Sequence, residues 1–344
     1  MSSIIRHEGP PVIVLGVSRS GTTLLKEMLD RHSALAIPSE SYFIPQLWDR
    51  HGPRPDVESI LADLGRLARV REWGVQPDDV RRRVSATPSF ADVMRAVYGT
   101  YAEKRGKVRF GDKTPAYMQH LALLDRVFPG AQYVHILRDG RNAALSFVGM
   151  RRRPRFNWAR PRGLGAFACQ WDYEVRAARR FGSTTADGRY LELRYEDLVA
   201  APEPRLREVC AFLGLAFEPT MLEYYRGVDQ STLQDHPRLA QPPTESVREW
   251  RKQMAPDDLE RFEAIAGGLL ADLGYLRAQP VPSSAARARA ALERATFRAR
   301  LASWRAALVA VRRSPAWRLR QRYIRRTSDE DSRSLAYDPL RKSS

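Results

Sequence analysis

The sequence predicts an α/β domain in which a mostly parallel sheet carries helices on both faces. Two stretches, residues 12–29 and 133–147, each read as a strand, a tight turn and a helix. Further helices alternate with a strand along the rest of the chain, and that alternation favours parallel strands joined by crossover helices. A core of about 250–280 residues is an ordinary size for one such domain with a buried interior.

The first stretch begins with the apolar run Val12–Leu15, which has the length of a buried strand. A small, hydroxyl-rich turn follows at residues 16–23. From Thr22 a helical pattern sets in, with leucine and methionine side chains along one side as far as Leu29. A strand, a tight turn and a helix N-terminus aim backbone N–H groups and the positive end of the helix dipole at an anion. The stretch therefore predicts a phosphate-binding loop.

The spacing Gly16-x-x-x-x-Gly21 matches the phosphate loop of nucleotide-binding proteins, but Thr22 stands where such loops carry a lysine. That lysine reaches the β- and γ-phosphates, so its absence argues against a nucleoside triphosphate as substrate. A basic side chain appears earlier in the turn, at Arg19. We expect a P-loop-like, three-layer domain whose loop serves another phosphate-containing ligand.

The second stretch places an arginine at the end of a strand. Tyr133–Leu137 is apolar enough for a buried strand, Arg138 follows it, and Gly140 permits a tight turn before a helix that includes Ser146. Open α/β sheets bind ligands at the carboxyl ends of their strands. A forked guanidinium and a hydroxyl one turn into the next helix can converge on one phosphate.

The remaining elements follow from apolar residues at helical or alternating spacing. We expect helices at Val57–Val70, Asp92–Arg105, His120–Phe128, Gly163–Arg180, Pro202–Leu213 and Asp257–Leu273, and a strand at Tyr190–Arg194.

The positive charge is concentrated behind this domain. Residues 281–344 hold 16 Lys and Arg against 5 Asp and Glu, a net charge of +11 out of +17 for the chain. Apolar residues recur there at helical spacing: Phe297, Leu301, Trp304, Leu308 and Val311. We expect a main domain at 1–280, a basic amphipathic helical extension at 281–326 and a disordered tail at 327–344. Such a helix can pack on its own domain, contact a partner or lie on anionic lipid.

Composition narrows the setting. No run of 18 apolar residues exists, and residues 1–8 have no apolar core of a secretory signal. Two cysteines, Cys169 and Cys210, provide neither a disulfide framework nor a zinc site. We therefore expect a cytoplasmic protein without a metal, and its basic extension can make it peripheral to a membrane. The oligomeric state stays open.

The two motifs together resemble those of sulfotransferases that use 3′-phosphoadenosine-5′-phosphosulfate (PAPS). Ser18–Leu24 resembles their 5′-phosphosulfate loop, most of all in the tyrosylprotein and carbohydrate branches, and 132–146 resembles their 3′-phosphate motif. The resemblance spans about residues 10–275. It implies that Arg19, Ser20, Gly21, Thr22 and Thr23 hold the 5′-phosphosulfate and that Arg138 and Ser146 hold the 3′-phosphate.

Sulfuryl transfer also needs a base and cations. Because the group transfers in line, positioning and charge neutralisation dominate. Arg19 in the loop suits the second task, and the resemblance adds Lys113, in the segment 110–115. For the base we favour Glu40, in a Pro-flanked turn after the loop helix, which resembles the catalytic Glu of tyrosylprotein-type enzymes. His32 is the next candidate.

The other histidines offer less. His135 lies mid-strand and is expected to be buried, while His51, His120 and His236 have no supporting context.

The sequence departs from the family pattern at two places. Met150 stands where an arginine often follows the 3′-phosphate serine, with Arg151–Arg153 directly after it. The late cationic loop is replaced by 241–252, in which Trp250 matches the family's aromatic residue and Arg248, Arg251 or Lys252 supplies the cation. Tyr195 resembles a cofactor-contacting residue, with a core tyrosine as the alternative.

The sequence thus predicts a PAPS-dependent sulfotransferase acting on a hydroxyl of a carbohydrate, glycolipid, tyrosine or small natural product. Two alternatives remain. A P-loop nucleotide kinase or NTPase is disfavoured by Thr22. A nucleic-acid-binding protein is suggested by the pI near 10.3 but lacks an aromatic-basic binding motif.

Overall fold

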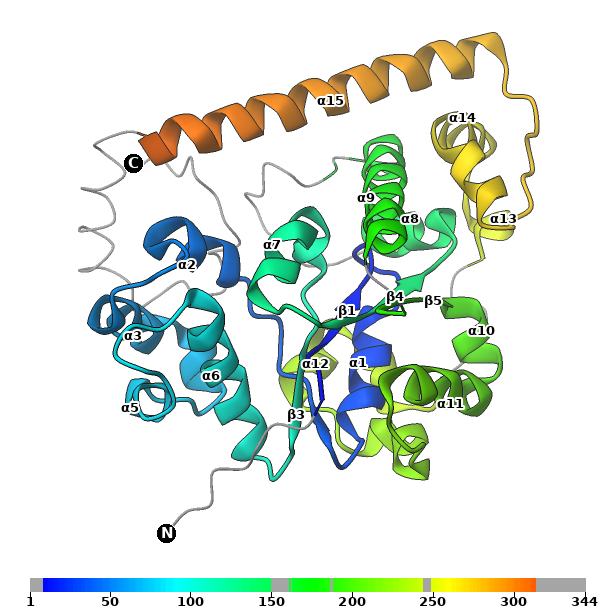
Figure 1. The fold of residues 1–344 in the computed structure, drawn as a ribbon. Helices are drawn as coiled ribbons and strands as arrows, with labels where there is room; N and C mark the ends of the chain where they lie inside the picture. Colours follow the sequence, from blue (N-terminus) through cyan, green and yellow to red (C-terminus); the bar gives the residue numbers. More distant parts are fainter. Residues whose placement is uncertain (1–8, 150–160, 162, 186–187, 244–248, 314–344) are drawn as a thin grey trace. The chain divides into compact units, whose positions relative to one another are not determined.

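A computed structural model of the chain describes residues 9–149, 161, 163–185, 188–243 and 249–313. Within these residues, five parallel strands form one sheet in the order β2-β3-β1-β4-β5 (Figure 1). Their bounds are β1 Val12–Leu15, β2 Leu35–Ala36, β3 Arg109–Asp112, β4 Gln132–Leu137 and β5 Tyr190–Arg194. The predicted α/β class is confirmed.

The helices connect these strands and continue beyond them. Their bounds are α1 Thr22–Asp30, α2 Ile44–His51, α3 Val57–Arg66, α4 Ala68–Glu72, α5 Pro77–Arg81, α6 Phe90–Glu103, α7 Leu121–Val127, α8 Gly140–Val148, α9 Leu164–Thr184, α10 Tyr195–Ala200, α11 Pro202–Leu213, α12 Gln230–Asp235, α13 Trp250–Gln253, α14 Pro256–Asp272 and α15 Ser284–Arg313. Short 3-10 helices lie at η1 Pro115–Gln119, η2 Pro219–Arg226 and η3 Pro237–Ala240.

The chain forms two compact units. The sheet unit comprises residues 1–138 and 177–247 and contains all five strands, whereas the helical unit comprises residues 139–176 and 248–344. The boundary expected at residue 280 stays a prediction.

Alternate side chains of the strands form the core of the sheet unit. Val12 and Val14 of β1 and Val134 and Ile136 of β4 belong to one buried cluster with residues of α1, α10, α11 and η2. Around β3, aromatic rings pack instead: Tyr98 of α6 lies 5.6 Å from Phe110 and 5.5 Å from Phe128, centroid to centroid. Period-two alternation thus gives the strands apolar partners among the surrounding helices.

Most predicted elements have the predicted places. Strands Val12–Leu15 and Tyr190–Arg194 and helix Pro202–Leu213 have the expected bounds. The helix expected at Val57–Val70 is two helices, because Leu67 is extended, with ψ of 112° between α3 and α4.

The helical unit is organised around a buried arginine. Arg141 donates to Asp139 Oδ2 at 2.7 Å, to Glu263 Oε1 at 2.5 Å and to the Leu276 carbonyl at 2.9 Å. Its side chain is 1% exposed.

The basic extension is helical as far as it is described. Helix α15 ends at Arg313, so the rest of the segment expected at 281–326 and the tail 327–344 lie outside the described residues. Arg294 donates to the carbonyls of Ala264 and Ile265 at 3.0 Å each, and the Phe297 ring lies 5.8 Å from Tyr173. Helix α15 thus packs within the helical unit. None of the described helices combines the length and apolar character needed to cross a bilayer.

Candidate active site

The residues predicted to act together follow the carboxyl ends of the strands. The loop 16–23 follows β1, Glu40 comes shortly after β2, Lys113 follows β3, Arg138 follows β4 and Tyr195 follows β5. All five strands are parallel, so these positions share one edge of the sheet. The loop follows the central strand β1, between connections that run to either side of it, and ligands bind at such a switch point.

The loop presents its main chain to an anion. Helix α1 begins at Thr22 after the N-cap residue Gly21, which makes no side-chain capping hydrogen bond. Its first turn carries no acidic residue, so no carboxylate there offsets the positive end of the helix dipole. The Ser20 N–H donates to the Val17 carbonyl at 3.0 Å, which closes the turn. Such an N-terminus is suited to a phosphate or sulfate group.

Two glycines are required by close approach. A Cβ at Gly16 would lie 2.6 Å from Thr22 Cγ2 and 2.9 Å from the Ile136 carbonyl. Gly21 has φ of 94°, and a Cβ there would lie 2.2 Å from the Tyr195 ring. The loop therefore fits only because these positions lack side chains.

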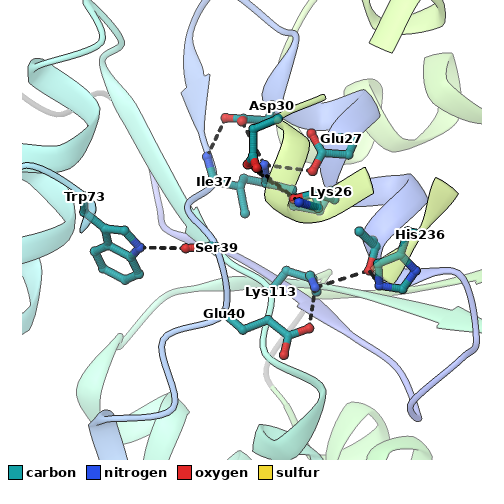
Figure 2. A network of polar contacts seen from close by, with 12 residues as sticks. Lys26, Glu27, Asp30, Ile37, Ser39, Glu40, Trp73, Lys113 and His236 are labelled. Atoms are coloured by element: carbon teal, nitrogen blue, oxygen red, sulfur yellow. Dashed lines mark hydrogen bonds and ion pairs between the residues drawn. The ribbon is translucent and has the colours of Figure 1, made fainter. Parts of the chain in front are cut away.

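Glu40 and Lys113 form an ion pair beside this loop. Lys113 Nζ donates to Glu40 Oε1 at 2.6 Å and to Thr23 Oγ1 at 3.4 Å. Figure 2 shows the contact between the Lys113 amine and the Glu40 carboxylate. The Lys113 side chain is 5% exposed and that of Glu40 is 25% exposed. The chain of contacts joins the candidate base, a candidate cation and the first turn of α1.

A buried network beneath the pair fixes its neighbours. Ser41 Oγ donates to Asp112 Oδ2 at 2.8 Å and lies 2.7 Å from Tyr117 Oη, while Tyr98 Oη donates to the same Asp112 oxygen at 2.7 Å. Burial raises the pKa of the Asp112 carboxyl above its usual range. Since Ser41 follows Glu40 and Asp112 precedes Lys113, this network holds both backbones.

The path from α1 to Glu40 is also tied down (Figure 2). The Ile37 N–H donates to Asp30 Oδ1 at 2.8 Å, and Trp73 Nε1 donates to Ser39 Oγ at 3.0 Å. Asp30 accepts in addition from Lys26 Nζ at 3.0 Å.

Tyr42 is a site residue that the sequence did not single out. Its hydroxyl donates to Glu40 Oε2, and its φ of 56° lies in the left-handed region that tyrosine seldom adopts. Both carboxylate oxygens of Glu40 are thus engaged, one by Lys113 and one by Tyr42.

Arg138 braces the loop. Its Nη1 donates to the Arg19 carbonyl at 3.0 Å, and its guanidinium carbon lies 4.4 Å from the centre of the Tyr195 ring. The Nε atom is buried without a hydrogen-bond partner. Arg138 and Tyr195 thus lie at the loop, as expected, and their contact with a 3′-phosphate stays a prediction.

His236 reaches the loop from far along the chain. Arg19 Nη1 donates to His236 Nδ1 at 3.4 Å, and His236 Nε2 lies 3.5 Å from Thr23 Oγ1. The sequence carries no signal for this contact, because His236 stands alone between the short helices α12 and η3.

The other histidines have structural partners. His32 Nε2 lies 2.8 Å from the Ala216 carbonyl, and His32 Nδ1 accepts from the Ala34 N–H at 3.0 Å. His32 is therefore committed to the main chain at the end of α1. His135 is fully buried as expected, and burial lowers its pKa to about 3.

The rest of the predicted set belongs to the helical unit or lies outside the described residues. Ser146 is buried on α8, and Arg251 and Lys252 are exposed on α13. Trp250 packs against Arg141, whose guanidinium carbon lies 3.7 Å from the ring centre. Arg248 lies outside the described residues. In the described part of the chain, no group of three His, Cys, Asp or Glu side chains is arranged to hold a metal ion.

The chain is similar in sequence to several known proteins. The chain is 26% identical over 287 residues to protein-tyrosine sulfotransferase 1 of Danio rerio, covering 79% of this chain and 74% of the relative. It is 24% identical to the Drosophila melanogaster protein-tyrosine sulfotransferase, covering 78% of this chain and 52% of the relative. Against a 27% identical Aquifex aeolicus protein it covers 27% of the relative's length.

A solved structure shares the fold. The sulfotransferase domain from the curacin biosynthetic pathway superimposes with a TM-score of 0.54 at 22% identity, over 78% of this chain and 99% of that domain.

The family description "Sulfotransferase family" matches residues 10–219, which include all five strands, the loop, Glu40, Lys113, Arg138 and Tyr195. With its loop, its ion pair and its sheet in that span, the chain belongs to the sulfotransferase family.

Proposed function

We propose that the protein transfers a sulfuryl group from PAPS to an acceptor hydroxyl. The observation that carries the proposal is the contact chain from Glu40 through Lys113 to Thr23, which joins a carboxylate and a buried cation to the anion-binding loop. Membership of the sulfotransferase family supports it.

In this proposal the loop and the N-terminus of α1 bind the 5′-phosphosulfate through Arg19, Ser20, Gly21, Thr22 and Thr23. Arg138, with Tyr195 against it, lies at the same edge of the sheet and would bind the 3′-phosphate. We propose Ser146 and Arg248 as further ligands of the donor.

Glu40 would remove the proton of the acceptor hydroxyl as its oxygen attacks sulfur, while the bond from sulfur to the 5′-phosphate breaks. Negative charge then grows on the leaving phosphate, and Lys113 and Arg19 neutralise it. The proposal routes no step through a metal ion.

The names of the relatives suggest possible classes of acceptor. Protein-tyrosine sulfotransferases are named for tyrosine, and nodulation protein NoeE of Sinorhizobium fredii is 27% identical over 284 residues. A tyrosine, a carbohydrate or glycolipid hydroxyl and a small natural product all fit the proposal.

Ligand-dependent thermal stability tests donor binding. Adenosine 3′,5′-bisphosphate at about 100 times its Kd adds about 2.7 kcal/mol to the free energy of unfolding. AMP, which lacks the 3′-phosphate, should add much less. An equal increase in the free energy of unfolding with both ligands would contradict the proposed binding of the 3′-phosphate by Arg138 and Ser146.

Transfer of radiolabelled sulfate from PAPS to a metabolite extract tests the reaction, and isolating the labelled product identifies the acceptor. Magnesium-dependent ATP hydrolysis without sulfate transfer would favour the kinase or NTPase alternative. A steep salt dependence of duplex binding would favour nucleic acid.

We also propose a peripheral membrane role for α15 in a cytoplasmic protein. Arg287, Arg289 and Arg298 are exposed on this helix, and Leu292 of the same helix is 69% exposed. Each arginine near an anionic surface adds about 1 kcal/mol of attraction. The protein should sediment with anionic vesicles at low salt and be released at high salt. Sedimentation unchanged by Arg287→Glu with Arg289→Glu would contradict this role.

A further inference from the structure

His236 lies among the groups that surround the anion-binding loop. It contacts Arg19 through Nδ1 and Thr23 through Nε2, and Lys113 contacts the same Thr23 hydroxyl. The imidazole therefore lies next to two of the cations assigned to the transferring group.

The contact with Arg19 determines which ring nitrogen of His236 accepts a hydrogen bond and which carries the hydrogen. A guanidinium can only donate, so His236 Nδ1 accepts from Arg19. The hydrogen of the neutral ring is then on Nε2, directed to the Thr23 hydroxyl. A ring nitrogen thus presents to Arg19 the lone pair that an anionic oxygen would otherwise present.

The contacts are suited to exchange. At 3.4 and 3.5 Å they are long for hydrogen bonds, and the ring is half-buried. His236 also lies at the N-cap position of the short helix η3.

We propose that His236 is a ligand of the donor's 5′-phosphosulfate, binding its oxygens together with Arg19 and Thr23. The proposal rests on the proposed function. When oxygens of the bound anion accept hydrogen bonds from the Arg19 guanidinium, His236 Nδ1 no longer accepts from Arg19. The Nε2–H of the ring then donates to the same anion.

Two half-ligands separate this role from general damage. Adenosine 5′-phosphosulfate carries the group that His236 would bind, whereas adenosine 3′-phosphate lacks it. His236→Ala should weaken binding of adenosine 5′-phosphosulfate by about 10–100-fold, the usual cost of a charge-assisted hydrogen bond. Binding of adenosine 3′-phosphate should be unchanged, with both measured by titration calorimetry.

Two further variants complete the test. His236→Gln keeps an N–H donor and should recover part of the affinity. Arg238→Ala, an exposed cation two residues away, should affect both ligands slightly and equally. Unchanged or tighter binding of adenosine 5′-phosphosulfate by His236→Ala overturns the proposal. If the unaltered protein binds neither half-ligand nor adenosine 3′,5′-bisphosphate, the proposed function fails instead.

Discussion

Two of the buried ion-paired clusters in the described part of the chain differ in character. In the helical unit, Arg141 is 1% exposed and pairs with Asp139 and Glu263, whose side chains are 6% and 0% exposed. In the sheet unit, Lys113 is 5% exposed, but its partner Glu40 is 25% exposed.

The difference lies in what each cluster leaves accessible. Arg141 uses Nε, Nη1 and Nη2 within the protein and stacks on Trp250, so its cluster has no opening for a ligand. The Lys113 pair lies instead against the loop 16–23, and the Glu40 side chain is 25% exposed. A saturated ion pair holds a fold together, whereas an open one beside a helix N-terminus can take a substrate.

The strongest test of this contrast is Glu40→Gln. Loss of the base should lower turnover by about 10²–10⁴-fold. The free energy of unfolding should fall by less than in the closed cluster, because Gln keeps the shape and an oxygen that accepts a hydrogen bond from Lys113. Sulfate transfer to the labelled acceptor and urea unfolding measure the two effects. Glu203→Gln on the surface of α11 is the matched control, and full turnover in Glu40→Gln would move the base elsewhere.

The closed cluster should show the reverse behaviour. Arg141→Met leaves two buried carboxylates unpaired and should lower the free energy of unfolding by about 3–5 kcal/mol. Arg207→Met, which breaks an exposed pair with Glu203, should cost less than about 1 kcal/mol. If Arg141→Met does not fold, Arg141→Lys keeps the charge and should lie between them. A loss as small as that of Arg207→Met contradicts a structural role.

Ser41→Ala probes the network that joins the open pair to the core. It removes the hydroxyl that bridges Asp112 and Tyr117, which should cost about 1–3 kcal/mol of stability. Turnover should fall as well, because Glu40 and Lys113 adjoin this network. Ser303→Ala, at an exposed helix position, should stay within about 0.5 kcal/mol. Turnover that is unchanged at full occupancy of the donor would separate the network from the site.

The remaining test concerns His135, a fully buried histidine. Its pKa is lowered from 6.5 to about 3 by burial, and its Nδ1 lies 2.6 Å from Tyr190 Oη. Between these pH values the unfolded chain binds a proton that the folded chain does not, so acid favours unfolding. Below pH 6.5 this histidine should therefore remove up to about 1.4 kcal/mol per pH unit.

Chemical unfolding between pH 7 and 5 measures this slope. In His135→Gln, the free energy of unfolding should depend less steeply on pH, by the amount that His135 contributes. An identical slope in the two proteins would show that His135 stays neutral in both states or titrates in both.

Local patterns were sufficient for much of the fold. The apolar run at 12–15, the glycine-containing turn and the amphipathic helix at 202–213 depend on neighbouring residues, and the structure confirms them. Strand β3 was not predicted because its first and last residues, Arg109 and Asp112, are charged. Both are buried, since the Arg109 guanidinium donates to Pro10 O, Leu213 O and Gln132 Oε1.

The residues of the candidate site could be proposed from the sequence only one by one. Arg19, Glu40, Lys113 and Arg138 were named from motifs, yet their mutual contacts depend on strand order, which no local spacing encodes. Tyr42 and His236 were missed for the same reason. Tyr42 depends on an unusual backbone angle and His236 on a contact across 217 positions.

Strand β1 is made first and paired late. In the sheet, Val12 lies opposite Gly111 of β3 on one side and opposite Gln132 of β4 on the other. During synthesis the ribosome releases this apolar strand long before either neighbour exists, and unpaired apolar strands invite aggregation. The anion-binding loop that follows it is likewise exposed without Lys113, Arg138 or Tyr195. The order of translation thus leaves the protein a vulnerable interval that ends only when β5 has emerged.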